Sequence, residues 1–310
     1  MRDRFADVVT RALDEDERVA LVLAEIGVAR LAELGVLDRH QARVVNVGIR
    51  EQLLISVAAG MALEGMRPVA HSYAPFLVER PFEQIKLDLT HQDVGAVLVS
   101  IGASYDASAE GRTHQAPGDV ALLATLPGWT IHVPGHPLEA EQLLQGSIAG
   151  SGRVYVRLTD ETNAQPHLDR PLTIVRRGSR GAPLVLAIGP TLDPVLEATE
   201  ELDTTVAYAT TVRPFPAREL RAALQGAEVA LVEPTLAGTS SAEVSIALQD
   251  MPHRLLALGV RNVELRRYGT KHEHRAAHGL DAGGLRRSLE AFLDSPALAR
   301  GRRRATWARR

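Results

Sequence analysis

Glu51 is the first residue whose position could support acid and base chemistry. It lies in the segment VVNVGIREQ, residues 44–52, where three valines within four positions predict the end of a buried strand. Asn46 or Gly48 can then open a helix, which places Glu51 in its first turn. One face of this helix would carry apolar residues that recur every four positions, namely Ile49, Leu53, Val57 and Met61. A carboxylate in a first turn also complements the helix dipole, so a purely structural role would explain Glu51 as well.

His114 is the second such residue, and it belongs to the polar segment EGRTHQ, residues 110–115. This segment follows the apolar run VGAVLVSIG of residues 94–102, which is too short to span a membrane and is typical of a buried strand. A lone histidine in a polar loop is usually only solvated. However, parallel sheets bind ligands beyond the carboxyl ends of their strands, and His114 falls where that rule expects a site.

Together the two segments resemble the pyrimidine-binding domain of transketolases and of 1-deoxyxylulose-5-phosphate synthases. In that family the first motif is roughly GIAEQ and the second is DGPTHQ; here GIREQ and EGRTHQ occur in the same order at a compatible spacing. The resemblance covers nearly the whole chain, including YGT at residues 268–270 and GLD at residues 279–281. It implies that the Glu51 carboxyl hydrogen-bonds the aminopyrimidine of thiamine diphosphate, and that His114 faces an oxygen of the substrate. Both are therefore the expected catalytic residues.

The same resemblance implies that an aromatic ring stacks on the pyrimidine. Family members carry Phe-Leu ahead of an aromatic residue, an acid and Gln-Ile. Here Phe76 and Leu77 precede FEQI, residues 82–85, with one inserted residue. Phe76 is the expected stacking residue and Tyr73 is the alternative, although packing at a strand end would also explain these aromatic residues. Ile49, an apolar neighbour of the catalytic motif, is assigned to the same pocket.

Substrate contacts are expected from His114, Glu110 and Arg112. Glu110 replaces the usual Asp of the motif and Arg112 replaces its usual Pro, and both changes lie where an acceptor would pass. Sugar-phosphate transketolases also carry a histidine ahead of the Thr-His-Gln motif, at a place that corresponds here to the neighbourhood of Gly102. These departures from the family pattern indicate an altered acceptor.

A phosphate-binding arginine of those enzymes is missing as well. It follows the strand that ends near Thr159, where this chain has Asp160 and Glu161, and two acids would repel a phosphate dianion. We therefore expect that the acceptor is not a conventional sugar phosphate, or that Arg112 or Arg157 takes the place of the missing clamp.

The half of the family site that binds the diphosphate and Mg²⁺ is not found in this sequence. Relatives use a Gly-Asp-Gly motif for it, because Mg²⁺ prefers oxygen ligands beside the phosphates. The only Gly-Asp pair here, Gly118-Asp119, continues into Val120. The chain is therefore expected to be the β-type subunit of a split transketolase, which transfers a two-carbon ketol unit from a ketose-type donor to an aldehyde acceptor. Thiamine diphosphate and Mg²⁺ would be shared with a separate subunit in an α2β2 heterotetramer, and no metal ligand is expected in this chain.

Apolar runs that alternate with helical segments predict an α/β fold of two domains, each a mainly parallel sheet with helices on both faces. Residues 1–165 are predicted to form the pyrimidine-binding domain, and residues 183–298 a smaller domain similar to the transketolase C-terminal domain. Residues 166–182, rich in Asp, Pro, Gly and Arg, are predicted to be a linker. Residues 299–310 form a basic tail.

Composition narrows the class of protein. A chain of 310 residues with 45% hydrophobic residues can bury two cores, and its net charge of −3 with balanced signs implies no general attraction to nucleic acid or anionic membranes. The absence of cysteine excludes disulfides and thiolate sites. No apolar leader or spanning segment is found, so the chain is expected to be cytoplasmic. The histidines at 272, 274 and 278 are expected to be solvated or hydrogen-bonded surface residues.

Three other functions remain open. The β subunit of a 2-oxoacid dehydrogenase first component has the same two domains and also needs an α partner. Those chains usually carry a Gln-His-Ser-Gln type segment where this one has Thr113, His114 and Gln115, which favours the transketolase side. A non-catalytic scaffolding subunit would have no need of Glu51 and His114. A nucleotide-binding module is disfavoured because no GxGxxG or P-loop motif opens a helix.

Overall fold

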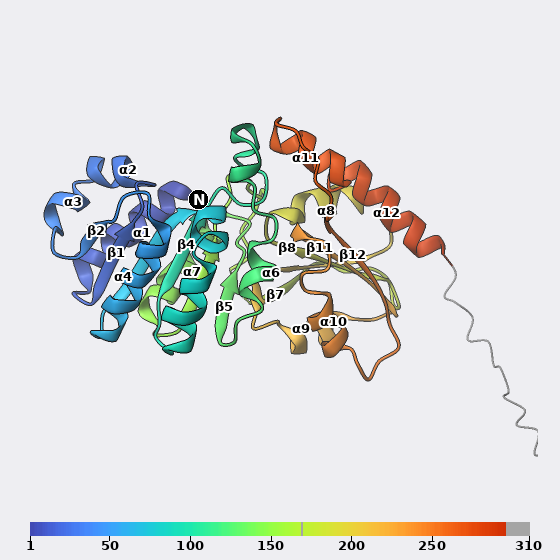
Figure 1. The fold of residues 1–310 in the computed structure, drawn as a ribbon. Helices are drawn as coiled ribbons and strands as arrows, with labels where there is room; N and C mark the ends of the chain where they lie inside the picture. The colour runs from blue at the N-terminus through green and yellow to red at the C-terminus, as the bar shows by residue number, and fades with distance from the viewer. Residues whose placement is uncertain (169, 296–310) are drawn as a thin grey trace, which may run out of the picture.

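The structure is a computed structural model that describes residues 1–168 and 170–295, so the predicted basic tail lies outside the described residues. Its architecture is two mainly parallel sheets, each covered by helices on both faces, as Figure 1 shows. The first sheet has the strand order β10-β5-β6-β4-β3-β1-β2 and the second has the order β12-β11-β8-β9-β7. The predicted α/β fold is therefore confirmed.

The first sheet is parallel except for β10, which pairs antiparallel with β5. Its strands are β1 (Val19–Leu23), β2 (Val44–Asn46), β3 (Arg67–Tyr73), β4 (Val97–Ile101), β5 (Trp129–His132), β6 (Arg153–Arg157) and β10 (Thr211–Arg213). One face carries α1 (Arg2–Glu15), α2 (Val28–Glu33), α3 (Val36–Arg39) and α7 (Pro137–Ala149). The other face carries α4 (Glu51–Leu63), the π-helical segments η1 (Pro75–Glu79) and η2 (Ile85–His91), α5 (Phe82–Gln84) and α6 (Asp119–Leu123).

The second sheet is smaller and has one antiparallel edge strand, β7. Its strands are β7 (Leu172–Arg176), β8 (Leu184–Ile188), β9 (Thr205–Ala209), β11 (Glu228–Leu236) and β12 (Arg254–Val260). The short segment η5 (Gly189–Thr191) leads into α8 (Leu192–Ala198), which packs with α12 (Ala282–Asp294) on one face, while α9 (Ala217–Ala223) and α10 (Ser241–Ala247) cover the other. In Figure 1, α11 (Lys271–His278) lies at the end of this domain that adjoins the first domain.

The boundary between the two halves differs from the predicted one. Residues 172–176 fall inside the predicted linker but form β7, because the strand pairs with β9 and Leu172 at its start is buried in the core. Residues 211–213 follow β9 of the second sheet, yet they form the edge strand of the first. The turn-forming residues on either side of β7 predict a loop, and the strand forms only because it pairs with β9, which is distant in the sequence.

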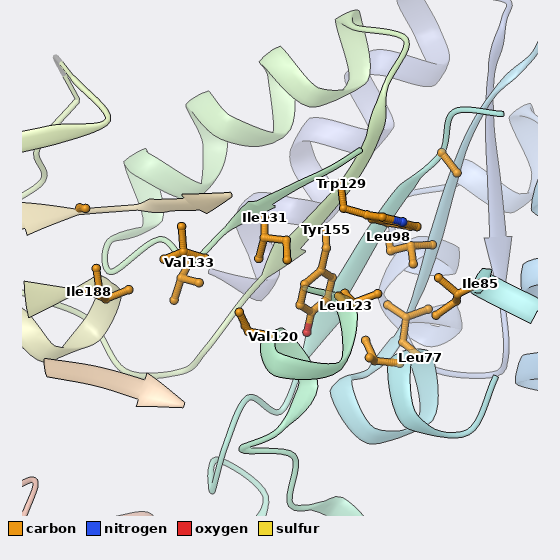
Figure 2. Close-up of a cluster of buried hydrophobic side chains, with 14 of the residues drawn as sticks. Leu77, Ile85, Leu98, Val120, Leu123, Trp129, Ile131, Val133, Tyr155 and Ile188 are labelled. Carbon is orange, nitrogen blue, oxygen red and sulfur yellow. The ribbon is translucent and has the colours of Figure 1, made fainter. Parts of the chain in front are cut away.

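The two domains share one apolar core. The largest cluster of buried side chains contains residues of both sheets, and Figure 2 shows it running from Leu77 and Ile85 past Trp129 to Val133 and Ile188. Ile188 is the last residue of β8, whereas Val133 directly follows β5. Because packing at this junction is continuous, the second domain has a defined position relative to the loops of the first.

Two of the three C-terminal histidines are buried at the domain junction, so the prediction that they lie on the surface was wrong. The rings of His274 and His278 stack on Tyr105, with centroids 4.3 and 5.3 Å away, and the Tyr105 hydroxyl is 2.9 Å from His278 Nε2. The short sequence spacing of these histidines could not reveal that a residue of the first domain covers them. Within the described ranges, no helix is long and apolar enough to cross a membrane.

His71 is fully buried on β3, so its protonation should make the stability of the fold depend on pH. Its Nδ1–H donates to the Val99 carbonyl 2.8 Å away, its ring lies 4.3 Å from that of Phe5, and burial lowers its pKa to about 4. Between pH 6.5 and 4 the unfolded chain therefore binds more protons than the folded one. We therefore expect His71 to lower the free energy of unfolding by about 3 kcal/mol as the pH falls from 6.5 to 4. The free energy of unfolding in urea, measured across this pH range, checks this.

The variant His71→Gln is expected to show a flatter dependence of stability on pH than the wild type. His272→Gln is the matched control, because His272 is exposed. Equal slopes for the wild type and His71→Gln would contradict the assignment of this proton-linked destabilisation to His71.

Candidate active site

Glu51 is the first residue of α4, and its side chain is 1% exposed. The chain turns between β2 and α4 at Gly48, whose φ of +71° favours glycine. Asn46 supports this turn, since its side-chain oxygen accepts from the backbone N–H groups of Gly48 and Glu25, each at 3.1 Å. The helix thus begins slightly later than predicted, and the expected placement of Glu51 in the first turn is correct.

Arg80 contacts Glu51, and the motif analysis did not identify it. Arg80 Nη1 donates to Glu51 Oε2 at 2.7 Å, and its guanidinium carbon lies 4.2 Å from the centroid of the Phe76 ring. The cation therefore bridges the carboxylate and the aromatic ring, with charge-assisted and cation–π contacts. The spacing of four residues between Phe76 and Arg80 was the available signal, because residues four apart share one helical face.

The structure brings three predicted site residues from separate segments together. Tyr73 ends β3, Phe76 lies in η1 and His114 ends the short segment η4 (Arg112–His114). The ring centroid of His114 is 4.9 Å from that of Phe76 and 5.7 Å from that of Tyr73. A Cβ at Gly102 would lie 2.2 Å from the Tyr73 ring, so this position cannot carry the family's additional histidine. Tyr73, Phe76 and His114 thus form one cluster of aromatic rings, with Arg80 against the Phe76 ring.

Ile49 and Leu53 lie at the outer edge of this region. Ile49 is 72% exposed and Leu53 is 44% exposed, whereas Val57 and Met61 are partly buried. The core side of α4 carries other residues instead, namely Leu54, Ile55, Ala58 and Ala59. In this chain Ile49 therefore faces solvent, and α4 presents an apolar edge next to the buried carboxyl.

The predicted acceptor residues lie where the second domain meets the first. Arg112 is exposed; its Nε donates to Glu264 and its Nη1 donates to the carbonyl of Gln115, both at 2.9 Å. Glu110 is exposed at the end of the short segment η3 (Ser108–Glu110). Ser108 Oγ donates to the Gly269 carbonyl at 2.7 Å. The second domain therefore braces the loop that carries His114.

Arg157 cannot serve as a phosphate clamp, so that hypothesis was wrong. Its side chain is fully buried, and its Nε forms an ion pair with Asp119 Oδ2 at 2.7 Å. The Tyr155 hydroxyl donates to the same Asp119 oxygen at 2.7 Å, and Arg157 Nη2 donates to Ser104 Oγ at 2.7 Å. Ser104 in turn donates to the carbonyl of Pro234 in β11. This network fixes the loop before His114 and connects it to the second domain.

Asp160 and Glu161, which replace the family's phosphate clamp, are engaged within the chain. Lys271 Nζ lies 2.6 Å from Asp160 Oδ1, and Arg275 pairs with Glu161. Both cations belong to α11 of the second domain. Burial and the neighbouring Asp160 and Glu161 carboxylates raise the pKa of Asp106, which adjoins this pair. Asp160 and Glu161 therefore connect the two domains through ion pairs. Lys271 and Arg275 are already paired with these acids.

The site offers contacts that fit the pyrimidine end of thiamine diphosphate. A carboxyl that is almost completely buried, with the Phe76 ring and an apolar edge nearby, offers the contacts that a planar aminopyrimidine requires. Across residues 1–168 and 170–295, no group of three or more histidines, aspartates or glutamates could hold a metal ion. Glu51 and Phe76 are thus candidates for holding the organic part of the cofactor.

Comparison with known proteins identifies the family of the first domain. The family model "Transketolase, pyrimidine binding domain" matches residues 1–164. An uncharacterized 33.6 kDa protein in the fasciation locus of Rhodococcoides fascians is 52% identical, over 93% of this chain and 93% of its own length. The 1-deoxy-D-xylulose-5-phosphate synthase 2 of Geobacter sulfurreducens is 32% identical, over 91% of this chain and 47% of its own length. The class of protein is therefore one with a pyrimidine-binding domain.

The chain belongs to the transketolase family, as the two motifs predicted. It spans about half the length of the synthases that it matches. One of the apulose-4-phosphate transketolase subunits of Actinobacillus succinogenes has a comparable length and is 28% identical over 92% of this chain and 94% of its own. A solved structure described as a split gene transketolase, inactive beta4 tetramer, shares the fold with a TM-score of 0.80 at 21% identity, covering 94% of this chain and 96% of that one.

Proposed function

We propose that this chain is the β-type subunit of a thiamine-diphosphate-dependent transketolase-like enzyme, which transfers a two-carbon ketol unit from a ketose-type donor to an aldehyde acceptor. The observation that supports this function most directly is the buried Glu51 carboxyl beside Phe76 and Arg80. Two relatives of similar length are named as transketolase subunits, one for apulose 4-phosphate and one for 6-deoxy-6-sulfo-D-fructose. The fold, the family and the candidate site all fit one half of such an enzyme.

Glu51 is the residue that would hydrogen-bond the aminopyrimidine of the cofactor. When bound, thiamine diphosphate supplies the carbanion chemistry, and the protein supplies orientation and electrostatics. Arg80 contacts Oε2 of Glu51, which leaves Oε1 for the ring nitrogen of the aminopyrimidine. A carboxyl shielded from water shares a proton with such a weak base more readily than a solvated one does. Phe76 would contact the aminopyrimidine ring and help to orient it.

His114 acts at the substrate oxygen. Its Nδ1 lies 3.0 Å from Thr113 Oγ1, and a hydroxyl that donates to Nδ1 leaves the ring proton on Nε2. The Nε2–H group can then donate to a hydroxyl or carbonyl oxygen of the substrate. Packing against Tyr73 and Phe76 holds the ring in position.

A separate subunit completes the site. It supplies the Gly-Asp-Gly motif, the diphosphate contacts and Mg²⁺, and it packs against the apolar surface around α4. That surface contains the exposed side chains Ile49, Leu53, Leu63 and Leu87. Exposed apolar residues gathered around one helix are typical of a protein interface. Two copies of each subunit form an α2β2 heterotetramer.

Calorimetric titration tests this proposal. Thiamine diphosphate and Mg²⁺ are titrated into this chain alone and into its mixture with the candidate partner that carries the Gly-Asp-Gly motif. We expect tight binding only in the mixture, because this chain offers only the pyrimidine half. A folded complex of the two chains that binds no cofactor would overturn the proposal.

The acceptor is not a conventional sugar phosphate. Arg157 is buried, Arg112 is paired with Glu264, and the acids at 160 and 161 replace the clamp. Loss of a charge-assisted clamp costs about tenfold or more in kcat/KM. We therefore expect unphosphorylated aldoses to be used at least as well as their phosphorylated forms by the assembled enzyme. Activity restricted to phosphorylated aldoses would rule this out.

A further inference from the structure

A cleft of about 550 Å³ lies outside the candidate active site, between α7, the β5 edge of the first sheet and the segment that leads to β7. None of the predicted catalytic, cofactor or substrate residues lines it. We call it the α7 cleft. Its polar lining comes from both halves of the chain and includes Arg67, Thr130, His132, Ser147 and Thr211. Its volume suits a small metabolite.

The described lining of the α7 cleft carries two arginines against one carboxylate, and burial lowers the pKa of His132 to about 4, so that this imidazole is neutral at pH 7. Arg67, Arg170, His132 and His167 line it, whereas Glu139 is the one carboxylate among its described lining residues. Glu139 is already engaged, because its oxygens accept from the Tyr208 hydroxyl at 2.7 Å and from the backbone N–H groups of Gly135 and His167 at 2.8 Å. These donors are neutral groups, and among the described residues Glu139 forms no ion pair with Arg67 or Arg170, so the arginines of the cleft exceed its carboxylate in number by one.

Arg67 is a buried cation without a counter-ion among the described residues. It is 5% exposed, and it donates to two carbonyls only, those of Ser147 and Gly152, at 2.5 and 2.7 Å. Its Nε is buried and has no partner in the described part of the chain. Burial, and to a smaller extent the nearby Arg18 charge, lower its pKa to about 10, so the side chain is still charged at neutral pH. A buried charge without a counter-ion raises the free energy of the folded state. An anion bound in the cleft would supply a counter-ion for the Arg67 guanidinium.

The neighbouring groups can complete such an anion site. His132 lies 3.0 Å from Thr211 Oγ1 through its Nδ1, and Thr130 lies two residues earlier on the same side of β5. The guanidinium fork suits planar or tetrahedral oxyanions, and hydroxyl and imidazole groups donate to their remaining oxygens. We infer that the α7 cleft binds a small metabolite through a phosphate group, at a site separate from the catalytic one.

Gly146 provides a way to block the cleft while keeping Arg67. It lies in α7, it lines the cleft, and a Cβ at this position meets no atom within 4 Å. Gly146→Phe would fill the cleft without removing a hydrogen bond, and replacing a glycine inside a helix does not weaken the helix. Gly60→Phe is the matched control, since Gly60 lies inside α4, has equally open surroundings and is outside the cleft.

The experiment measures the thermal midpoint of the full chain with inorganic phosphate and with glycerol 3-phosphate, at constant ionic strength set with sodium chloride. We expect a rise in midpoint that saturates with ligand, because a ligand that binds only the folded state stabilises it. The rise should persist in Gly60→Phe and vanish in Gly146→Phe. Arg67→Lys should weaken the apparent affinity about tenfold, because lysine cannot form the fork. No saturable rise in the wild type, or an equal rise in Gly146→Phe, would overturn the inference. A rise with inorganic phosphate alone would overturn the assignment to a phosphorylated metabolite and identify the ligand as free phosphate.

Discussion

Glu51→Gln is expected to lower turnover of the assembled enzyme by about 10²-fold or more, while the fold remains intact. Glutamine has nearly the same shape as glutamate, but it cannot give or take the proton that the aminopyrimidine requires, and loss of a positioned acid or base typically costs about 10²–10⁴-fold. The ion pair with Arg80 is also lost. Because Arg80 is partly exposed, that loss should change stability by less than about 1 kcal/mol. Steady-state turnover with a ketose donor, measured together with urea denaturation, checks both parts.

Glu64→Gln is the matched control for this prediction. Glu64 follows the last residue of the same helix and is exposed, so its replacement should leave both turnover and stability unchanged. Binding of the cofactor to the assembled Glu51→Gln enzyme distinguishes a chemical defect from an assembly defect. A Glu51→Gln enzyme with full turnover would remove Glu51 from the catalytic role and leave only its structural role at the start of α4.

Asp119→Asn is expected to destabilise the fold by about 3–5 kcal/mol. Asp119 and Arg157 form an ion pair with almost no exposure, and removing one partner leaves an uncompensated charge in the core. Tyr155 also loses a charged acceptor for its hydroxyl. The free energy of unfolding in urea measures the effect. The loop that carries His114 should loosen as well, because Arg157 holds Ser104 in that loop.

Two further variants give this prediction its controls. Asp250→Asn breaks the ion pair with Arg221 on the surface and should change the free energy of unfolding far less than Asp119→Asn does, because solvent screens exposed pairs. The double variant Asp119→Leu with Arg157→Met should recover much of the loss, since it leaves no buried charge. If Asp119→Asn cost no more than Asp250→Asn, the buried pair would contribute little to stability.

Several features of this protein follow from local sequence. The valines before Asn46 and the small, apolar residues after Glu51 predict a strand, a turn and a helix, and the structure has these elements in that order. The apolar runs of both sheets were identifiable because parallel strands are buried on both faces. The two motifs around Glu51 and His114 identified the family and half of the candidate site. These features depend on neighbours in the chain, so a single sequence contains the information.

Other features were decided only by the tertiary structure. The apolar residues around α4 occupy more than one side of it, so the sequence alone could not show that Leu54 faces the core and Ile49 faces solvent. The position of Arg157 suggested a ligand contact until its pairing with Asp119 appeared. Lys271 lies far along the chain from Asp160, which it neutralises. Such pairs form when whole layers of the fold pack together. Local sequence preferences do not specify which distant residue a side chain will contact, so these pairs could not be predicted from one sequence.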